Sequence, residues 1–150
     1  FELKPLDLTD VFEYAKKYLD ISLEMCQYVY ERSDGETKMI QQILHLLYIQ
    51  KEKEITKEEI DTVIKEIINS KDSSYKLLFD TLGNNQKIAL KIVGIYKSGV
   101  FASSILTQYN IKKQTLQSSI DTLLKKELID KEDDRYFIPD RTFELWIEGL

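Results

Sequence analysis

Few side chains in this chain could carry out chemistry, and none stands in a pattern typical of a catalytic site. His45 is the single histidine, and it lies in an apolar run without a Cys or His neighbour at metal-ligand spacing. Cys26 is the single cysteine, and its apolar helical surroundings indicate a buried structural thiol rather than a reactive one. We therefore expect a core or groove histidine and an inert thiol.

Two pairs of adjacent acids could share proton-transfer work. Glu58-Glu59 begins a predicted helix, where carboxylates suit the positive end of the helix dipole. Asp133-Asp134 lies in a predicted turn, where solvation explains the charges. The five glycines form neither a phosphate-binding loop nor a dinucleotide fingerprint. The sequence therefore predicts no catalytic, cofactor-binding or metal-binding residue, and a chain that is not itself an enzyme.

The composition is that of a helix-rich globular chain. Its 150 residues are 43% hydrophobic and 31% charged, with two prolines, which is enough for one domain or two small ones. No apolar run approaches the roughly 18–20 residues that cross a membrane, and no signal peptide opens the chain. With the lone cysteine, this predicts a cytoplasmic protein without a membrane partner. A start at Phe1 rather than Met predicts a piece of a longer protein.

The net charge of −5 is unevenly distributed along the chain. Residues 1–82 carry 11 Lys and Arg against 17 Asp and Glu, whereas residues 83–150 carry 10 against 9. DNA-binding domains usually show a basic excess, because phosphate contacts dominate their affinity. The nearly neutral second part therefore argues against DNA without excluding it.

The first part of the chain shows helical periodicity throughout. We expect Thr9 to cap the first helix, and Thr56, with Glu59 three residues later, to form a capping box on the fourth. A polar joint at Ser70–Ser74 places the domain boundary after residue 72, giving domains 1–72 and 73–150. The four predicted helices are Asp7–Tyr18, Ile21–Tyr30, Thr37–Lys51 and the one that Thr56 begins.

The second part has the element order of a winged helix-turn-helix. After a short helix at Tyr75–Leu82 come three helical patterns and two short apolar runs, with a polar stretch at Asp130–Arg135 between those runs. A last helix, carrying Asp140, Phe143 and Trp146, closes the unit. The three helical patterns are Asn85–Lys97, Val100–Tyr109 and Lys113–Lys126, and the strand-like runs are Leu128-Ile129 and Tyr136–Ile138.

The helix that begins at Lys113 occupies the recognition position of such a fold. Lys, Gln and Ser side chains at its start could reach phosphates and base edges in a major groove, or contact a protein partner. The alternative is a solvated face on a helix that packs for structure, and Asp121 on the same face would repel phosphate. The candidate contact residues are Lys112, Lys113, Gln114, Gln117, Ser118 and Lys125.

The nine tyrosines are a further compositional feature. Five of them, in the helical first part, could share one face. Core packing and a partner-binding patch both remain open for this group. Its members are Tyr14, Tyr18, Tyr28, Tyr30 and Tyr48.

Several short motifs resemble, in order and spacing, the C-terminal region of archaeal-type ATPases in the STAND branch of the AAA+ superfamily. Phe1–Leu6 resembles the entry to the helical lid, Ser33–Thr37 the lid turn, and Ile55–Ile60 the start of the last lid helix. Tyr136–Ile147 resembles the closure of the family's winged helix. The lid turn lacks the family's usual proline, and the closing Asp-Pro stands here as Pro139-Asp140.

This resemblance implies a mainly α chain, with a four-helix AAA+-type lid bundle followed by a winged helix-turn-helix with a small β-hairpin wing. It implies that ATP and magnesium belong to a parent ATPase core that would precede Phe1, so this part would hold no cofactor. The partners would be that core and possibly another protein.

Two functions from different classes follow. The chain could be the non-catalytic part of a P-loop ATPase that couples nucleotide state to a winged-helix regulatory or interaction module. Alternatively, it could be a stand-alone winged-helix transcriptional regulator, dimeric on DNA, with recognition helices about 34 Å apart.

Overall fold

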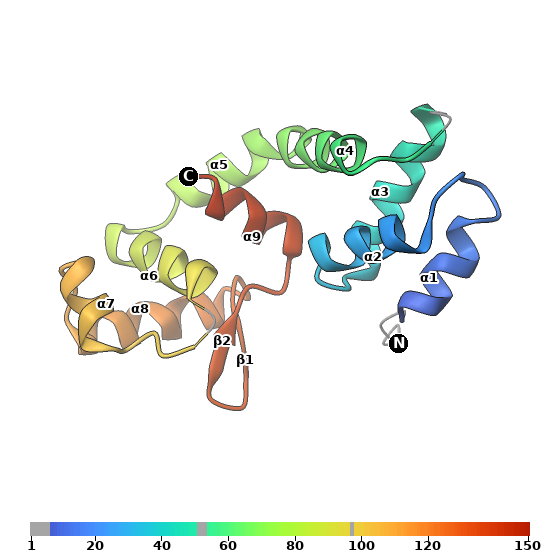
Figure 1. Cartoon of the computed structure of the whole chain (residues 1–150). Coiled ribbons are helices and arrows are strands. Elements are labelled where there is room, and N and C mark those ends of the chain that lie inside the picture. The colour runs from blue at the N-terminus through green and yellow to red at the C-terminus, as the bar shows by residue number, and fades with distance from the viewer. Residues whose placement is uncertain (1–6, 51–53, 97) are drawn as a thin grey trace. The chain divides into compact units, whose positions relative to one another are not determined.

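The chain is mainly α-helical, with one small antiparallel sheet (Figure 1). The computed structural model describes residues 7–50, 54–96 and 98–150. The predicted entry segment Phe1–Leu6 lies outside the described residues, as do Lys51 and Lys97, at which two predicted helices end. The expected fold class, a helical bundle followed by a winged helix with a hairpin wing, is confirmed.

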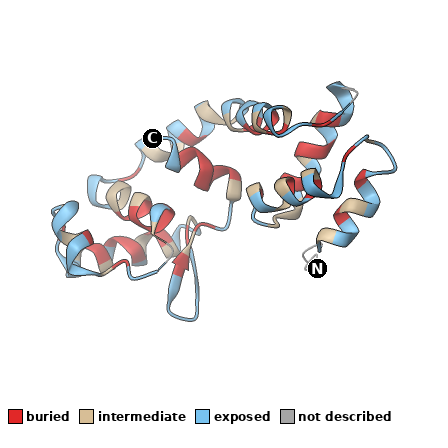
Figure 2. Ribbon diagram, in the orientation of Figure 1, coloured by how far each residue is buried: buried red, intermediate tan, exposed pale blue. Residues whose placement is uncertain are grey.

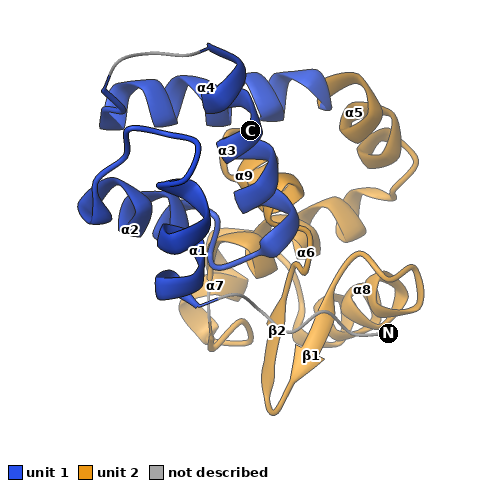
Figure 3. Ribbon diagram, turned by 90° about the vertical axis from the view of Figure 1, so that its right-hand side faces the viewer, with its two compact units in different colours: residues 1–71 blue, residues 72–150 orange. Residues whose placement is uncertain are grey.

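The chain divides into two compact units, residues 1–71 and residues 72–150, here called unit 1 and unit 2 (Figure 3). Unit 1 contains four described helices, as its periodicity predicts. α3 packs against both α2 and α4, and α1 packs against α2. The helices are α1 (Leu8–Ala15), α2 (Leu23–Arg32), α3 (Thr37–Gln50) and α4 (Lys57–Ser70).

Side-chain caps set where three of these helices begin. The prediction for Thr9 is wrong, because Asp7 caps α1 by accepting from the Asp10 amide at 2.9 Å. Ser22 caps α2 in the same way. Thr56 caps α4, as expected, and accepts from the Glu59 amide at 3.3 Å. Among the described residues, α4 shows only this half of the capping box, and the buried Glu59 Oε2 has no hydrogen-bond partner there.

The turn between α2 and α3 depends on two residues with left-handed backbone. Asp34 has φ of 53° and Gly35 has φ of 71°. A Cβ at Gly35 would also lie 3.2 Å from the Tyr30 ring. Both the φ angle and the close approach therefore favour glycine at this position.

The core of unit 1 gathers on α3 and α4, whose buried positions are visible in Figure 2. Burial of the aliphatic side chains there is the main stabilising contribution to this unit. Cys26 is fully buried beside them, as predicted. α3 is not buried on all sides. In its C-terminal half, His45, Tyr48 and Ile49 are exposed. The largest buried side chains are Met39, Ile40, Ile43, Leu47, Ile60 and Ile64.

The first helix of unit 2 begins at Asp72, earlier than the predicted helix Tyr75–Leu82. The stretch Ser70–Ser74, expected to be a polar joint, is helical except at Lys71. Ser70 lies at the end of α4 and donates to the Ile67 carbonyl, and Asp72 lies in the first turn of α5 and accepts from Trp146 Nε1. Such short polar side chains are tolerated at helix ends because they find hydrogen-bond partners there. The helices are α5 (Asp72–Asp80), α6 (Asn84–Ile95), α7 (Ser103–Gln108), α8 (Lys113–Lys125) and α9 (Arg141–Glu148).

The hairpin wing is formed by β1 (Asp130–Glu132) and β2 (Arg135–Phe137), with Lys131 paired to Tyr136. The first strand therefore falls in the predicted polar stretch, not at Leu128-Ile129. Ile129 instead anchors the hairpin in the core at 2% exposure. β1 is exposed throughout, so its strand needs no apolar alternation. Asp133, with φ of 55°, closes the short turn.

The core of unit 2 lies where α6 packs against α8 and α9. Gly94 in α6 permits this approach, since a Cβ there would lie 3.2 Å from Ile138 Cδ1 and 3.3 Å from Ile147 Cγ2. Leu116, Ile120 and Leu123 form the buried stripe of α8, which the sequence predicts. Among the described residues of the whole chain, no helix combines the length and apolar character that a bilayer crossing requires.

Candidate functional site

The exposed face of α8 is the first candidate surface, because this helix follows α6 and α7 in the order of a helix-turn-helix. Lys112 is its N-cap residue, and its capping position has no side-chain hydrogen bond. Five of the six predicted contact residues are exposed: Lys112, Lys113, Gln114, Ser118 and Lys125. The sixth, Gln117, is half-buried and donates to Asp121 Oδ1 at 3.0 Å.

The charges around α8 are mixed. Lys113 Nζ lies 5.9 Å from the centre of the Phe101 ring, a cation–π distance that keeps this ammonium near the surface of unit 2. Asp121 is exposed on the same helix, and Glu132, Asp133 and Asp134 are exposed in the wing. A phosphate backbone approaching both the helix and the wing would meet these carboxylates, which weakens its attraction to the lysines.

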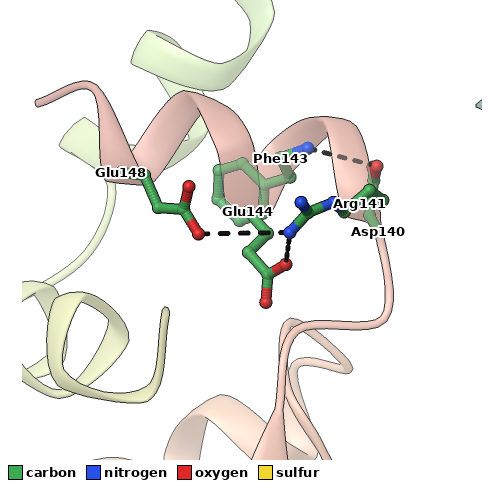
Figure 4. Close-up of polar contacts among 5 residues, drawn as sticks. All are labelled: Asp140, Arg141, Phe143, Glu144 and Glu148. Carbon is green, nitrogen blue, oxygen red and sulfur yellow. Dashed lines mark hydrogen bonds and ion pairs between the residues drawn. The ribbon is translucent and has the colours of Figure 1, made fainter. Parts of the chain in front are cut away.

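The closing helix α9 is held by an aromatic and polar cluster. Asp140 caps it by accepting from the Phe143 amide at 3.2 Å (Figure 4). The Phe143 and Trp146 rings stack 5.9 Å apart, and Tyr75 packs 4.8 Å from Phe143. Trp146 Nε1 donates to Asp72 Oδ1 at 2.8 Å. The Tyr75 hydroxyl also donates to Asp140 Oδ2 at 3.4 Å. Hydrogen bonds and tilted aromatic rings thereby join α5 to α9 and its cap.

An ion pair lies along the same helix. Arg141 bonds Glu144 three residues later, and its Nη1 lies 4.0 Å from Glu148 Oε1 (Figure 4). Glu144 is only 5% exposed, so its charge depends on the paired guanidinium. Sequence reasoning missed Asp72, Arg141 and Glu144. The i,i+3 spacing of Arg141 and Glu144 is a signal that could have found that pair.

Unit 1 contributes an open groove along α1 and α3, with a volume of about 650 Å³. Tyr14, Tyr18 and Tyr48 line it, and their exposed fractions are 57%, 59% and 45%. His45 lines the same groove and is exposed. Of the two positions expected for this histidine, core or groove, it therefore occupies the groove.

The five tyrosines of unit 1 do not form one core face. The ring centres of Tyr14 and Tyr18 are 5.5 Å apart, and those of Tyr18 and Tyr48 are 6.2 Å apart. Tyr28 instead donates to Asp61, a hydrogen bond that raises the pKa of the Tyr28 phenol. Tyr30 packs beside the turn at Gly35. Tyr14, Tyr18 and Tyr48 thus form an exposed surface, whereas Tyr28 and Tyr30 make contacts within unit 1.

The described ranges 7–50, 54–96 and 98–150 contain no cluster of side chains suited to holding a metal ion. Three or more potential ligands do not converge anywhere in those ranges. Glu58 and Glu59 lie in the first turn of α4, as expected of acids at a helix start. Burial raises the pKa of the Cys26 thiol to about 11, which disfavours the reactive thiolate.

Comparison with known protein families decides the class of unit 2. A family described as "probable winged helix domain" matches residues 73–149. The chain belongs to this family. The winged helix domain therefore comprises α5 to α9 and the hairpin, and the candidate contact residues on α8 lie within it.

A solved structure extends the likeness to both units. The structure of a Walker-type ATPase of Pyrococcus abyssi is similar to this chain with a TM-score of 0.70 and 16% sequence identity. The similarity covers 96% of this chain and 42% of that ATPase. At this identity, the likeness shows a shared fold. A search of curated proteins found no match to the chain.

Proposed function

We propose that this chain is the non-catalytic C-terminal portion of a P-loop ATPase, in which unit 1 is the helical lid and the winged helix domain is a regulatory or interaction module. The observation that carries this proposal is the fold likeness to a Walker-type ATPase over 96% of the chain. The lid-like and winged-helix motifs, which follow one another in the order of the AAA+ region, support it independently.

The proposed mechanism is conformational. A nucleotide would be bound between the ATPase core and the helical lid, and its hydrolysis would change the angle between them. The winged helix domain would respond because the two nucleotide states favour different arrangements. In this account ATP and magnesium are cofactors of the parent protein, and residues of this chain supply neither catalytic groups nor metal ligands.

The charge distribution favours a protein partner for the winged helix domain over DNA. Residues 72–150 carry 11 Lys and Arg and 11 Asp and Glu, so unit 2 has no net charge. The exposed acids of the wing add local repulsion toward phosphate. A DNA-binding unit of this size would gain most of its affinity from an excess of cations.

Two titrations of residues 1–150 test the proposal. Calorimetry with ATP and magnesium is expected to show no micromolar binding, because the nucleotide-binding core is a separate part of the parent. Fluorescence anisotropy with DNA duplexes is expected to show no saturable binding at low salt. Tight ATP binding by the chain would refute the assignment of unit 1, and salt-dependent DNA binding lost in Lys112→Glu/Lys113→Glu would support a DNA-binding regulator instead.

A further inference from the structure

The open groove along α1 and α3 in unit 1 has the features of a surface that binds a peptide. Tyr14 lies in α1 and Tyr18 shortly after it, while Lys38, His45 and Tyr48 lie in α3. Small-molecule sites bury most of their ligand, whereas these tyrosines are about half exposed and suit a longer chain that lies across them. We propose that the groove binds a proline-rich segment of a partner protein, in the polyproline II conformation, with one acidic residue opposite Lys38.

The three exposed tyrosines form a continuous row. The ring centres of Tyr14 and Tyr18 are 5.5 Å apart with the rings inclined at 57°, and those of Tyr18 and Tyr48 are 6.2 Å apart at 83°. Rings set at such angles present apolar faces against which a proline ring can pack. A polyproline II helix advances about 9 Å in each turn of three residues, which is comparable with the two ring distances taken together. Two prolines one turn apart can therefore contact the same row, as in aromatic grooves that recognise such segments.

The polar groups of the groove can all donate hydrogen bonds. Gln41, Gln42 and His45 line it with the tyrosines, and none of the described lining residues is acidic. In the part of the chain that the structure describes, the three tyrosine hydroxyls form no hydrogen bond, so donating to a ligand breaks none. A polyproline II segment leaves its backbone carbonyls without internal bonds, whereas an α-helix uses its own carbonyls internally. The donors therefore favour an extended proline-rich ligand over a helical one.

The charges of unit 1 select one acidic residue in the ligand. Lys38 is exposed, is the one formally charged residue of the described groove lining, and forms no ion pair among the described residues. A carboxylate placed beside it would gain a favourable charge contact. Residues 1–71 as a whole carry 10 Lys and Arg against 15 Asp and Glu. A ligand with many acids would therefore be repelled, and a single acid next to the prolines fits both charges.

This inference goes beyond the proposed ATPase assignment and does not depend on it. Every lining residue lies in unit 1, and the ligand is a segment of a separate protein. The ATP titration described above tests the assignment, whereas a peptide titration tests the groove, so that either can fail while the other holds.

A peptide titration followed by amide chemical shifts tests the proposal on residues 1–150. The probe is acetyl-Glu-Pro-Pro-Leu-Pro-Pro-Leu-Pro-amide. One comparison peptide replaces its Glu by Lys, and the other carries the same single charge on a helix rich in Ala and Leu. We expect saturable shifts at Tyr14, Tyr18 and Tyr48 with the probe, with a Kd below about 1 mM. The Lys peptide should bind about fivefold more weakly, because its ammonium meets that of Lys38.

Two substitutions separate the aromatic contribution from the charged one. Tyr18→Ala removes the central ring and should weaken probe binding roughly tenfold, as truncation of a contact tyrosine does. Its melting temperature should change little, since Tyr18 is 59% exposed. Lys38→Glu should reverse the preference between the Glu and Lys peptides. Lys65→Glu, the matched charge reversal at an exposed position of α4, should leave that preference unchanged.

Several results would overturn the proposal. The probe could cause no saturable shifts up to about 1 mM, or bind Tyr18→Ala with unchanged affinity. Equal or tighter binding of the helical peptide would assign the groove to a helix instead. The same shifts on raising the protein concentration without peptide would assign it to a second copy of this chain.

Discussion

At the scale of single residues, Trp146 shows how a side chain can be placed by two kinds of contact at once. Its ring stacks on Phe143, while its Nε1 donates to Asp72 Oδ1 at 2.8 Å. Tryptophan suits this position because it combines a large apolar area with one polar group that requires a partner. The sequence identified Trp146 as part of the closure. Its partner Asp72, 74 residues away in the chain, lay in a stretch read as a joint.

Substitution of Trp146 separates these two contacts. Trp146→Phe keeps a stacked ring and removes the N–H, so the free energy of unfolding should fall by about 1–2 kcal/mol. Trp146→Ala should cost about 3–5 kcal/mol, because it also leaves a cavity. Urea denaturation measures both. Asp72→Asn retains an acceptor oxygen and should cost less than Trp146→Phe; equal effects of the Phe and Ala variants would contradict this account.

Cys26 provides a test that depends on pH. Burial raises the pKa of its thiol from 9.0 to about 11. At pH 8 the folded chain therefore has a much smaller thiolate fraction than the unfolded chain. We expect labelling by a disulfide reagent to be slow in the native protein and fast in urea. Above pH 9 the folded state should lose stability relative to Cys26→Ala, since unfolding then releases the thiol proton. Rapid labelling of the native protein would contradict a buried thiol.

At the scale of elements, helices were predicted better than the wing. Long apolar periodicity specifies α3, α4 and α8, because each buries one stripe of the helix. The strand β1 could not be located by alternation, since all three of its residues are exposed. The cap of α1 was misplaced because Asp7 and Thr9 are both good N-cap residues, and sequence alone does not choose between them.

The exposed tyrosines of unit 1 show a further limit at this scale. Residues at helical spacing predict a shared face, but not whether another element covers it. Tyr28 is engaged by Asp61, a residue from α4, whereas Tyr14 and Tyr18 remain exposed. Periodicity therefore identifies faces, and only the packing of the elements distinguishes core from surface.

Gly94, where α6 packs closely against Ile138 and Ile147, should tolerate little added side-chain volume. Gly94→Val would bring new atoms against Ile138 and Ile147, which already lie 3.2 and 3.3 Å from an ideal Cβ. We expect a loss of about 1–3 kcal/mol in unfolding free energy, typical of overpacking. Gly149→Val is the control, because its Cβ would have only ordinary contacts, 3.6 Å or longer. Chemical denaturation showing equal effects at both glycines would disagree with this packing.

At the scale of the whole molecule, the order of elements identified the winged helix domain, and the family match at residues 73–149 agrees with it. Function was harder to predict because the candidate contact residues on α8 suit both phosphate and protein. Five of these six residues are exposed and Gln117 is half-buried; their contact with a partner stays a prediction. The choice between partners depends on charges from the wing and from α8 together, which no single motif contains.

The compact unit of residues 72–150 is expected to fold by itself. Its helices pack around a buried core of their own, and the family match covers nearly all of it. Expressed alone, it should show a cooperative thermal transition and dispersed amide resonances. A chain without cooperative unfolding would show that this core is insufficient for independent stability.

The sequence of the reading frame upstream of Phe1 tests the ATPase assignment most directly. The account predicts a glycine-rich loop ending in Lys-Ser or Lys-Thr, followed by a strand that ends in an acidic residue. An upstream frame that encodes no such phosphate-binding loop, or a start codon immediately before Phe1, would contradict it.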